Sequence, residues 1–463
     1  MSSSLVYDLA CHRVEGVFVD LVAETDGWSD RIPVLTDDLA QLTDPRRRRG
    51  QRYDLLFLLL VLVMAVLAGA TSISGVLRWA RTAPEGVLSV LARGGRTRLP
   101  VHSTFSRLLS RLDGDELDDA FSRYTAALLA PGDLLPDPAP VPGWLPADHL
   151  LALEPGPTVK SVTAVELSDA VVDSGPAVAS KDDRDCVAAP ASPGACLGGR
   201  VPVRAWSLDG KSVRGAATAT TRAPHLVSVL RHDTNTVAAQ RNVDVKTNEI
   251  TVFEEVLNVI PDLRGQVVIA DALHTQRSHA TYLHGREAFY LFPVAENQPK
   301  LFEAVNAMAW AQAPVGFEES GKGHGRNERR LTKVLEAPAD LPFPNAAQVI
   351  LTERITIGRP GGKIHAVAAL AITSLPARLA GPRDLAGHIR NHWRIEVNHH
   401  IRDTTYGEDA SQVRTGSAPR IMASIRNQAL NLAHIAGFTS TPDANDHYKA
   451  RPDQALELLG LTM

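Results

Sequence analysis

The stretch Trp206-Ser-Leu-Asp-Gly-Lys-Ser-Val-Arg-Gly215 places an acidic residue, Asp209, at the end of a short apolar run. A second apolar run, Val267-Val-Ile-Ala-Asp271, also ends in a carboxylate and is followed by turn and helix signals. Short apolar runs bounded by turn residues are typical of buried β-strands. We therefore predict two buried strands, each of which delivers a carboxylate at its end.

A third acidic residue, Glu396, lies in His392-Trp-Arg-Ile-Glu-Val-Asn-His-His400, inside a helical pattern that spans residues 384–403. Carboxylates from two strand ends and one later helix can converge on a pair of divalent cations. Two such cations, about 3.5–4 Å apart, activate the attacking oxygen and stabilise the leaving oxygen in phosphodiester cleavage. The leading prediction is therefore metal-dependent DNA chemistry, with Asp209, Asp271 and Glu396 as catalytic residues and metal ligands.

The order of the predicted elements after residue 200 indicates the fold class. Three strands are close enough in sequence to form an antiparallel meander, and a crossover helix and two further strands separated by a helix follow them. This order is that of a ribonuclease H-like mixed α/β sheet flanked by helices. A β-rich insertion, at about residues 315–374, precedes the last catalytic helix. The predicted strands of the core are 203–208, 225–231, 236–243, 267–271 and 289–294.

The region 46–130 is predicted to be an all-α module, preceded by an N-terminal segment, 1–45. Between Arg78 and Arg111 it contains seven arginines and one acidic residue, Glu85. Two interpretations fit this cluster: a DNA-contacting surface, as a helix-turn-helix would present, or a solvated face of a small bundle. The possible DNA contacts in this module are Arg96, Arg98, Arg107 and Arg111.

An apolar run at residues 55–70 allows two interpretations of its own. It has basic residues just upstream, which is typical of a membrane span, and we consider an anchor over residues 55–77. However, a span needs about 20 apolar residues, and this run is shorter and is followed by no second hydrophobic segment. We therefore favour a buried core helix and expect no membrane partner.

Composition limits the remaining possibilities. The chain of 463 residues is 44% hydrophobic and 22% charged, as in ordinary globular proteins. Its three cysteines form no CxxC pair, and its first residues lack a secretion signal, so we expect a cytoplasmic protein. The net charge of −4 is unevenly distributed along the chain. An acidic, Pro/Ala/Gly-rich linker at 131–200 has ten acidic and four basic residues. A catalytic domain at 201–440 and a tail at 441–463 complete the predicted organisation.

Several motifs occur together and in order along the chain. They are Asp44-Pro-Arg46, Leu208-Asp-Gly-Lys-Ser-Val-Arg-Gly215, Lys246-Thr-Asn-Glu-Ile250, Ile269-Ala-Asp-Ala-Leu-His-Thr-Gln276, Asn297-Gln298, Gly323-His-Gly-Arg-Asn-Glu-Arg329, and His392-Trp-Arg-Ile-Glu396 followed by Tyr406-Gly-Glu-Asp409. With these motifs the chain resembles bacterial insertion-sequence transposases of the DDE type, in particular the H-repeat-associated group. The resemblance covers residues 44–435 apart from the linker.

The resemblance implies a DNA transposase that cleaves donor DNA and transfers a strand into target DNA. It implies two Mg²⁺ (or Mn²⁺) ions per site, double-stranded DNA partners (element ends and target), and a homodimer on DNA. At two positions the chain departs from the family pattern, since Ala295 stands for a lysine and Val397 for an asparagine. An alternative is therefore a catalytically impaired, transposase-derived DNA-binding protein.

Basic and polar residues near the three acids are the predicted DNA contacts. They are Lys211, Arg214, His274, Gln276, Arg326, Arg390, His392, Arg394, His400 and Arg402. A different interpretation concerns His392, Glu396 and His400, which share one helix face at i, i+4 and i+8 spacing. Imidazole and carboxylate ligands on such a face suit zinc. DNA contact is the interpretation that we favour for the two histidines.

Overall fold

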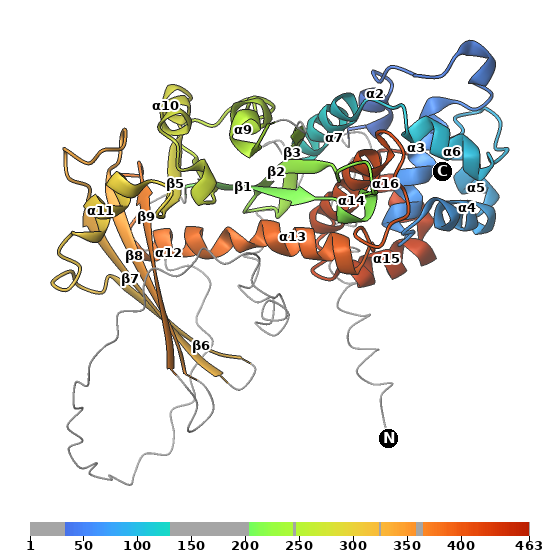
Figure 1. Cartoon of the computed structure of the whole chain (residues 1–463). Helices are drawn as coiled ribbons and strands as arrows, with labels where there is room; N and C mark the ends of the chain where they lie inside the picture. Colours follow the sequence, from blue (N-terminus) through green and yellow to red (C-terminus); the bar gives the residue numbers. More distant parts are fainter. Residues whose placement is uncertain (1–32, 130–202, 244–246, 324–325, 358–363, 463) are drawn as a thin grey trace, which may run out of the picture.

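The described residues form a nine-stranded sheet that has a cluster of helices at one end of the molecule, while the long strands of its other end extend away from that cluster (Figure 1). The structure is a computed structural model that describes residues 33–129, 203–243, 247–323, 326–357 and 364–462. The predicted linker, 131–200, lies outside the described residues, as do most of the N-terminal segment and residues 324–325.

The elements follow one another in three groups. The N-terminal helices are α2 (Leu35–Leu39), η1 (Arg48–Gly50), α3 (Leu55–Leu67), α4 (Ile73–Thr82), α5 (Glu85–Leu91), α6 (His102–Leu109) and α7 (Gly114–Leu128). The central elements are β1 (Ala205–Ser212), η2 (Arg214–Ala216), β2 (His225–Arg231), β3 (Thr236–Val243), α9 (Glu249–Asn258), β4 (Val267–Ala270), η3 (Ala272–His274), α10 (Arg277–Gly285), β5 (Phe289–Val294) and α11 (Pro299–Asn306). The remainder are β6 (Phe317–Gly323), β7 (Arg326–Glu336), β8 (Gln348–Ile357), β9 (Ile364–Thr373), α12 (Pro382–Asn391), α13 (Trp393–Thr404), α14 (Ala418–Ile435), α15 (Thr441–Ala450) and α16 (Pro452–Leu458).

The strand order is β3-β2-β1-β4-β5-β9-β8-β7-β6. Strands β1, β2 and β3 form an antiparallel meander, whereas β4 runs parallel to β1 and β5 runs parallel to β4. This confirms the predicted ribonuclease H-like arrangement of a mixed α/β sheet. The β-rich insertion is also confirmed, and it joins the same sheet because β9 pairs antiparallel with β5.

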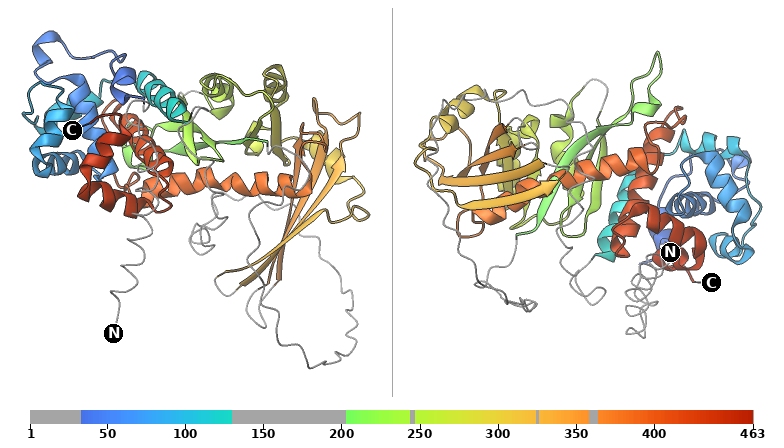
Figure 2. Two further views of the ribbon diagram at one scale, coloured as in Figure 1. Left: turned by 180° about the vertical axis from the view of Figure 1, so that it is seen from behind. Right: turned by 90° about the horizontal axis from the view of Figure 1, so that it is seen from below.

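The two faces of the central sheet carry different helices. Because side chains alternate along a strand, Trp206 and Leu208 of β1 face one side and Ala205 faces the other. The first side packs in a hydrophobic cluster with α9, α10 and α11. On the second side, Ala205 clusters with residues of β4 and with Leu385 of α12. Helices α12 and α13 run end to end along this second face (Figures 1 and 2).

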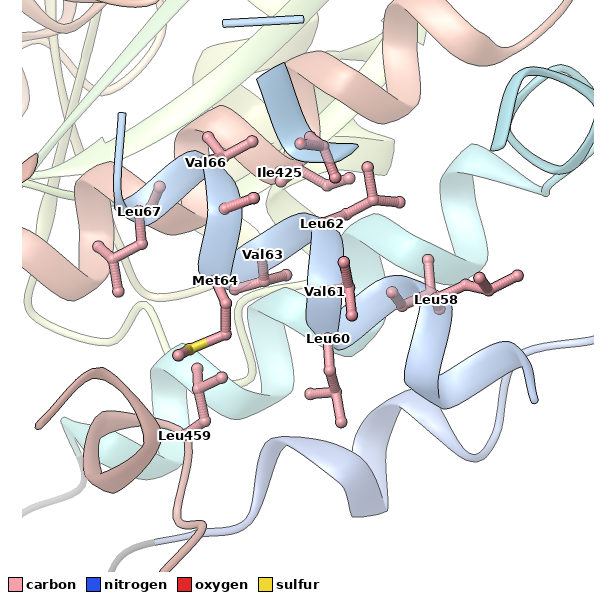
Figure 3. Close-up of a cluster of buried hydrophobic side chains, with 14 of the residues drawn as sticks. Leu58, Leu60, Val61, Leu62, Val63, Met64, Val66, Leu67, Ile425 and Leu459 are labelled. Atoms are coloured by element: carbon pink, nitrogen blue, oxygen red, sulfur yellow. The ribbon is translucent and has the colours of Figure 1, made fainter. Parts of the chain in front are cut away.

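The apolar run of the N-terminal module forms a buried core helix, as we favoured. All residues of α3 except Leu56 are buried. Figure 3 shows this helix surrounded by side chains from distant segments, among them Ile425 of α14 and Leu459, which follows α16. No helix within the described ranges is both long and apolar enough to cross a bilayer. Within the described residues, helices from the N-terminal module and from the C-terminal end thus share one core.

Two predicted boundaries near the acidic residues differ in the structure. Strand β1 does not end at Asp209 but continues to Ser212, because its pairing with β2 extends to Ser212↔His225 while its pairing with β4 stops at Leu208↔Ala270. The single helix predicted at 384–403 is divided into α12 and α13 at His392. The backbone of His392 keeps helical dihedral angles, so the two helices remain in line.

Candidate active site

Asp209 and Asp271 lie beside each other on neighbouring parallel strands. The last residue pair between β1 and β4 is Leu208↔Ala270, and the two aspartates are the next residues along the chain, Asp209 still in β1 and Asp271 directly after β4. Neighbouring strands are about 4.8 Å apart, so the two residues leave the ladder at the same level. Because side chains alternate along β1, Asp209 lies on the same face as Ala205 and Ser207, and this is the face that α12 and α13 cover.

Helix α13 brings Glu396 to the same place. Two of its histidines contact β1: Nδ1 of His392 lies 3.1 Å from Oγ of Ser207, and Nδ1 of His399 lies 3.5 Å from Oδ2 of Asp209. Glu396 is between these histidines in the helix, one turn from each, so it shares their face. The two histidines thus hold one face of this helix against β1, and Glu396 lies near enough to Asp209 for the charge of Asp209 to act on it.

The charges of the three carboxylates influence one another. Burial and the negative charge of Asp209 raise the pKa of Glu396 to about 7. Asp271 is exposed at the surface, but partial burial of its carboxyl raises its pKa, and the charges of Glu249 and Asp209 act in the same direction, against His274. The pKa of Asp209 lies below its usual value, because the contact with His399 outweighs the effect of burial. The site therefore concentrates negative charge.

The donor set fits a hard divalent cation. All three predicted ligands offer carboxylate oxygens, which Mg²⁺ prefers. A bound cation would offset the burial and the carboxylate repulsion that raise the pKa values of Asp271 and Glu396. The side chains do not already form a closed ligand set: nowhere in the described ranges do three or more His, Cys, Asp or Glu side chains group closely enough to hold an ion. The same finding applies to the zinc alternative, and His392 of that trio is directed at Ser207.

The loop after β4 holds Asp271 by several hydrogen bonds. Oδ1 of Asp271 accepts from the backbone N–H of Leu273 and thereby caps the short helix η3. The side-chain amide of Asn297 donates to the carbonyl of Ala272, and that of Gln276 donates to the carbonyl of Leu273. One carboxylate oxygen of Asp271 is therefore used to order the loop, and the other remains available.

Three of the predicted DNA contacts are buried within the protein. Nζ of Lys211 lies 2.6 Å from Oδ2 of Asp403 on α13, and the lysine side chain is 8% exposed. The side chain of His274 is fully buried, and so is that of Arg402, which pairs with Glu408 at 2.6 Å. Because these groups have internal partners, we leave Lys211, His274 and Arg402 out of the DNA-facing surface.

The other predicted contacts in this region are nearer the surface. Arg214 is exposed, and Arg390 is exposed but forms an ion pair with Glu319 of β6. Arg394 is half-buried and donates to the carbonyl of His232. His392, His400 and Gln276 are also half-buried. The side chain of Arg326 lies outside the described residues.

The arginines of the N-terminal module lie on one short segment. Arg96 and Arg98 are in the loop between α5 and α6, Arg107 is in the last turn of α6, and Arg111 follows it. All four are exposed, and within the described residues none has a side-chain partner. Four guanidinium groups are thus free to contact an external anion.

Sequence reasoning missed several residues that build this site. Ser207 contacts His392 at the start of α13, and His399 contacts Asp209. A single serine in a strand pattern or histidine in a helix pattern does not indicate such a contact. Glu408 accepts from Arg402 and from Arg426 in a fully buried cluster. Glu249 was noticed only as part of Lys246-Thr-Asn-Glu-Ile250, and its position beside Asp271 becomes visible only in three dimensions.

Two family models match the chain. The family described as "Transposase DDE domain" matches residues 204–432, which include all three acidic residues. A second family, described as "DDE_Tnp_1-associated", matches residues 36–125, which include the four exposed arginines.

Two curated proteins of Escherichia coli are similar to about half of the chain. The putative transposase YncI of strain O157:H7 is 30% identical over 241 residues, which are 49% of this chain and 60% of that protein. The H repeat-associated putative transposase YhhI of strain K12 is 30% identical over 241 residues, 49% of this chain and 63% of that protein. The chain thus spans less than two thirds of the length of these relatives.

Among solved structures, the piggyBac transposase in a synaptic complex with hairpin DNA matches with 8% identity and a TM-score of 0.35, over 95% of this chain and 80% of that one. A similarity this low supports no argument about the site.

Proposed function

Because the chain belongs to the family of bacterial DDE transposases that contains the H repeat-associated proteins, we propose that it cuts and joins DNA strands with Asp209, Asp271 and Glu396. The observation that carries the proposal is the placement of these acids on adjoining elements. Two of them leave neighbouring parallel strands at one level, and the third lies on the helix that covers that face. The raised pKa of Glu396 supports their proximity.

In this proposal the three residues would hold two divalent cations: Asp209 would serve both, Asp271 one of them and Glu396 the other. Two bound cations supply an activated oxygen nucleophile and stabilisation of the leaving oxygen. The protein contributes the orientation of the carboxylates. Asp209 is held by His399, Asp271 by its bond to the backbone of Leu273, and Glu396 by the docking of α13 on β1.

Double-stranded DNA is the proposed partner, both as element end and as target, and we propose that the chain acts on it as a homodimer. Near the acids, the proposed contacts are the residues that reach the surface: Arg214, Gln276, Arg390, His392, Arg394 and His400, together with Arg326. Arginine suits this task because its planar guanidinium group binds phosphate through two parallel hydrogen bonds.

A plasmid that carries the gene with its flanking DNA provides the test of activity. We expect the purified full chain to convert supercoiled plasmid to nicked circles with Mg²⁺ or Mn²⁺ and not with EDTA, because the carboxylates need cations to act on an anion. Binding to the flanking DNA without nicking would favour the catalytically impaired DNA-binding alternative. Absence of both binding and nicking would contradict the proposed function.

The N-terminal arginines are expected to contribute to DNA affinity through phosphate contacts. Each phosphate contact adds about 0.9 to the slope of log affinity against log salt concentration. Replacing Arg96, Arg98, Arg107 and Arg111 together with Gln should therefore lower that slope by roughly 3–4. Electrophoretic mobility shifts at several salt concentrations measure the slope.

The matched control for this charge change is Arg264→Gln. Arg264 is also an exposed arginine, but it lies in the loop between α9 and β4 and pairs with Asp262. Its replacement should leave the slope unchanged. An unchanged slope in the fourfold variant would mean that the four arginines form only a solvated face.

A further inference from the structure

The carboxylate of Glu249 contacts three segments that surround the proposed site. Glu249 is the first residue of α9, the helix that crosses from β3 to β4. Its Oε1 lies 2.6 Å from Nε2 of His225 on β2, and its Oε2 lies 3.5 Å from Nε2 of His274 in η3. It also lies directly over Gly210 of β1. One side chain therefore connects β1, β2 and the loop after Asp271.

Glu249 packs against Gly210, the residue that follows Asp209 in β1. A Cβ atom at Gly210 would lie 2.4 Å from Oε1 of Glu249 and 2.7 Å from Nε2 of His225, closer than real Cβ contacts. Because side chains alternate along a strand, this glycine faces the side of the sheet opposite to Asp209. Glu249 therefore supports β1 from the back and does not enter the space in front of Asp209.

The contact with His274 ties Glu249 to the loop that carries Asp271. His274 is fully buried, and neither of its ring nitrogens has a hydrogen-bond partner within 3.5 Å in the described structure. Its ring packs 5.3 Å from that of Phe253 on α9, which stacks on His279 at 3.8 Å. The carboxylate of Glu249 is thus the nearest charged group that can fix the orientation of His274.

The contact with His225 completes the connection between the strands. The other ring nitrogen of this histidine, Nδ1, lies 2.8 Å from Oγ of Ser212 at the end of β1. Burial raises the pKa of Glu249, but the hydrogen bond with His225 and the nearby ring of His274 outweigh it and bring the pKa to about 2. Glu249 is therefore an anion at every pH at which the protein would act.

We infer that Glu249 is a positioning residue for the proposed metal site. By contacting β1, His225 and His274 at once, Glu249 sets the separation of Asp209 and Asp271. The inference rests on the proposed function, because it assumes that the two aspartates hold cations. Some groups orient metal ligands without binding the metal themselves. Removing such a group typically lowers metal affinity or activity by about 10–100-fold. An acidic residue at the start of a helix also stabilises the helix, so the test must separate positioning from folding.

The experiment measures Mn²⁺ binding to the metal-free full chain by electron paramagnetic resonance of the free ion. Nicking of supercoiled plasmid is measured in parallel. Glu249→Gln keeps the size of the side chain and removes its charge. We expect it to weaken Mn²⁺ binding by about 10–100-fold, with an unfolding midpoint in urea close to that of the wild type. Nicking at limiting Mn²⁺ should fall by a similar factor and recover in part at high Mn²⁺. Glu254→Ala, a change of an exposed glutamate on the same helix, is the control and should match the wild type.

A second variant tests the contact itself. Gly210→Ala introduces a Cβ where the Glu249 carboxylate lies, so it should weaken Mn²⁺ binding in the wild-type background. In the Glu249→Ala background the carboxylate is gone and only the His225 ring, no longer bound to Glu249, must move away from the new Cβ, so the same change should cost less. This non-additivity is the signature of direct contact between two residues.

The outcomes distinguish this inference from the proposed function. If the wild type binds Mn²⁺ and nicks DNA while Glu249→Gln does both equally well, the positioning role is wrong and the proposed function stands. If Glu249→Gln lowers the unfolding midpoint without changing Mn²⁺ affinity, Glu249 serves only the fold. If the wild type neither binds Mn²⁺ nor nicks DNA, the proposed function itself fails.

Discussion

Replacing Asp209 with Asn is expected to lower the rate of metal-dependent nicking by at least about a thousandfold, which corresponds to roughly 4 kcal/mol of transition-state stabilisation. The reason is that Asp209 is the proposed bridge between two cations, and an amide oxygen carries no net charge to hold them. The fold should persist, because an amide of the same size can still contact Nδ1 of His399. The measurement is the initial rate of supercoiled-plasmid nicking in Mg²⁺ and in Mn²⁺.

The control for this prediction is Asp262→Asn, the same chemical change in a loop that precedes β4, whereas Asp271 follows that strand. This variant should nick at the wild-type rate. Asp271→Asn and Glu396→Gln should each resemble Asp209→Asn, and a double variant should cost little more than one change, because residues that act as a unit are not additive. Equal nicking by the wild type and Asp209→Asn would remove this residue from the mechanism.

The second large effect concerns stability. Glu408→Gln is expected to lower the free energy of unfolding by about 3–5 kcal/mol, because it leaves two buried guanidinium groups without a counter-charge. Glu408 is fully buried, pairs with Arg402 of α13 at 2.6 Å, and also accepts from Arg426 of α14 at 3.1 Å. Urea unfolding followed by circular dichroism measures the change.

The pH dependence of the same variant gives an independent check. Burial raises the pKa of Glu408, but Arg402 and Arg426 outweigh it and hold the pKa below its usual value. A depressed pKa contributes stability above the unfolded-state value, near 4.5, and that stability is lost as the pH falls toward the lower folded value. The difference between the wild type and Glu408→Gln should therefore shrink in acid.

A surface glutamate provides the comparison for this change. Glu303 of α11 is exposed, and Glu303→Gln should alter the free energy of unfolding by less than about 0.5 kcal/mol. If Glu408→Gln proved equally mild, Arg402 and Arg426 would have to find other partners or water in the variant.

Much of the candidate site was predictable because its signals are local. An apolar run that ends in a carboxylate, such as Val267–Asp271, indicates a strand and its terminus without any knowledge of the rest of the chain. The neighbouring placement of Asp209 and Asp271 then follows from the parallel pairing of β1 and β4. The end of β1 was misjudged because β1 has two neighbours, and its longer pairing with β2 extends it to Ser212.

The roles of single charged residues were not predictable in the same way. Lys211 and Arg402 look like phosphate ligands in the sequence, but each is buried against a carboxylate, Asp403 or Glu408. A sequence pattern shows that a residue is charged but not which partner compensates the charge. Burial of a charge is tolerated only with such a partner, and that partner is fixed by how the helices pack.

The amino-acid sequence alone determined the strands and helices of the core, their order, and the three acids that the order brings toward one edge, because side-chain periodicity and turn residues act over a few positions. Tertiary structure alone decided that α14 packs against both α3 and β3, that β9 carries the insertion onto β5, and that Glu249 stands behind Gly210. These contacts join residues far apart along the chain, and they are selected by the shared burial of apolar surface and the pairing of buried polar groups, which no local pattern records.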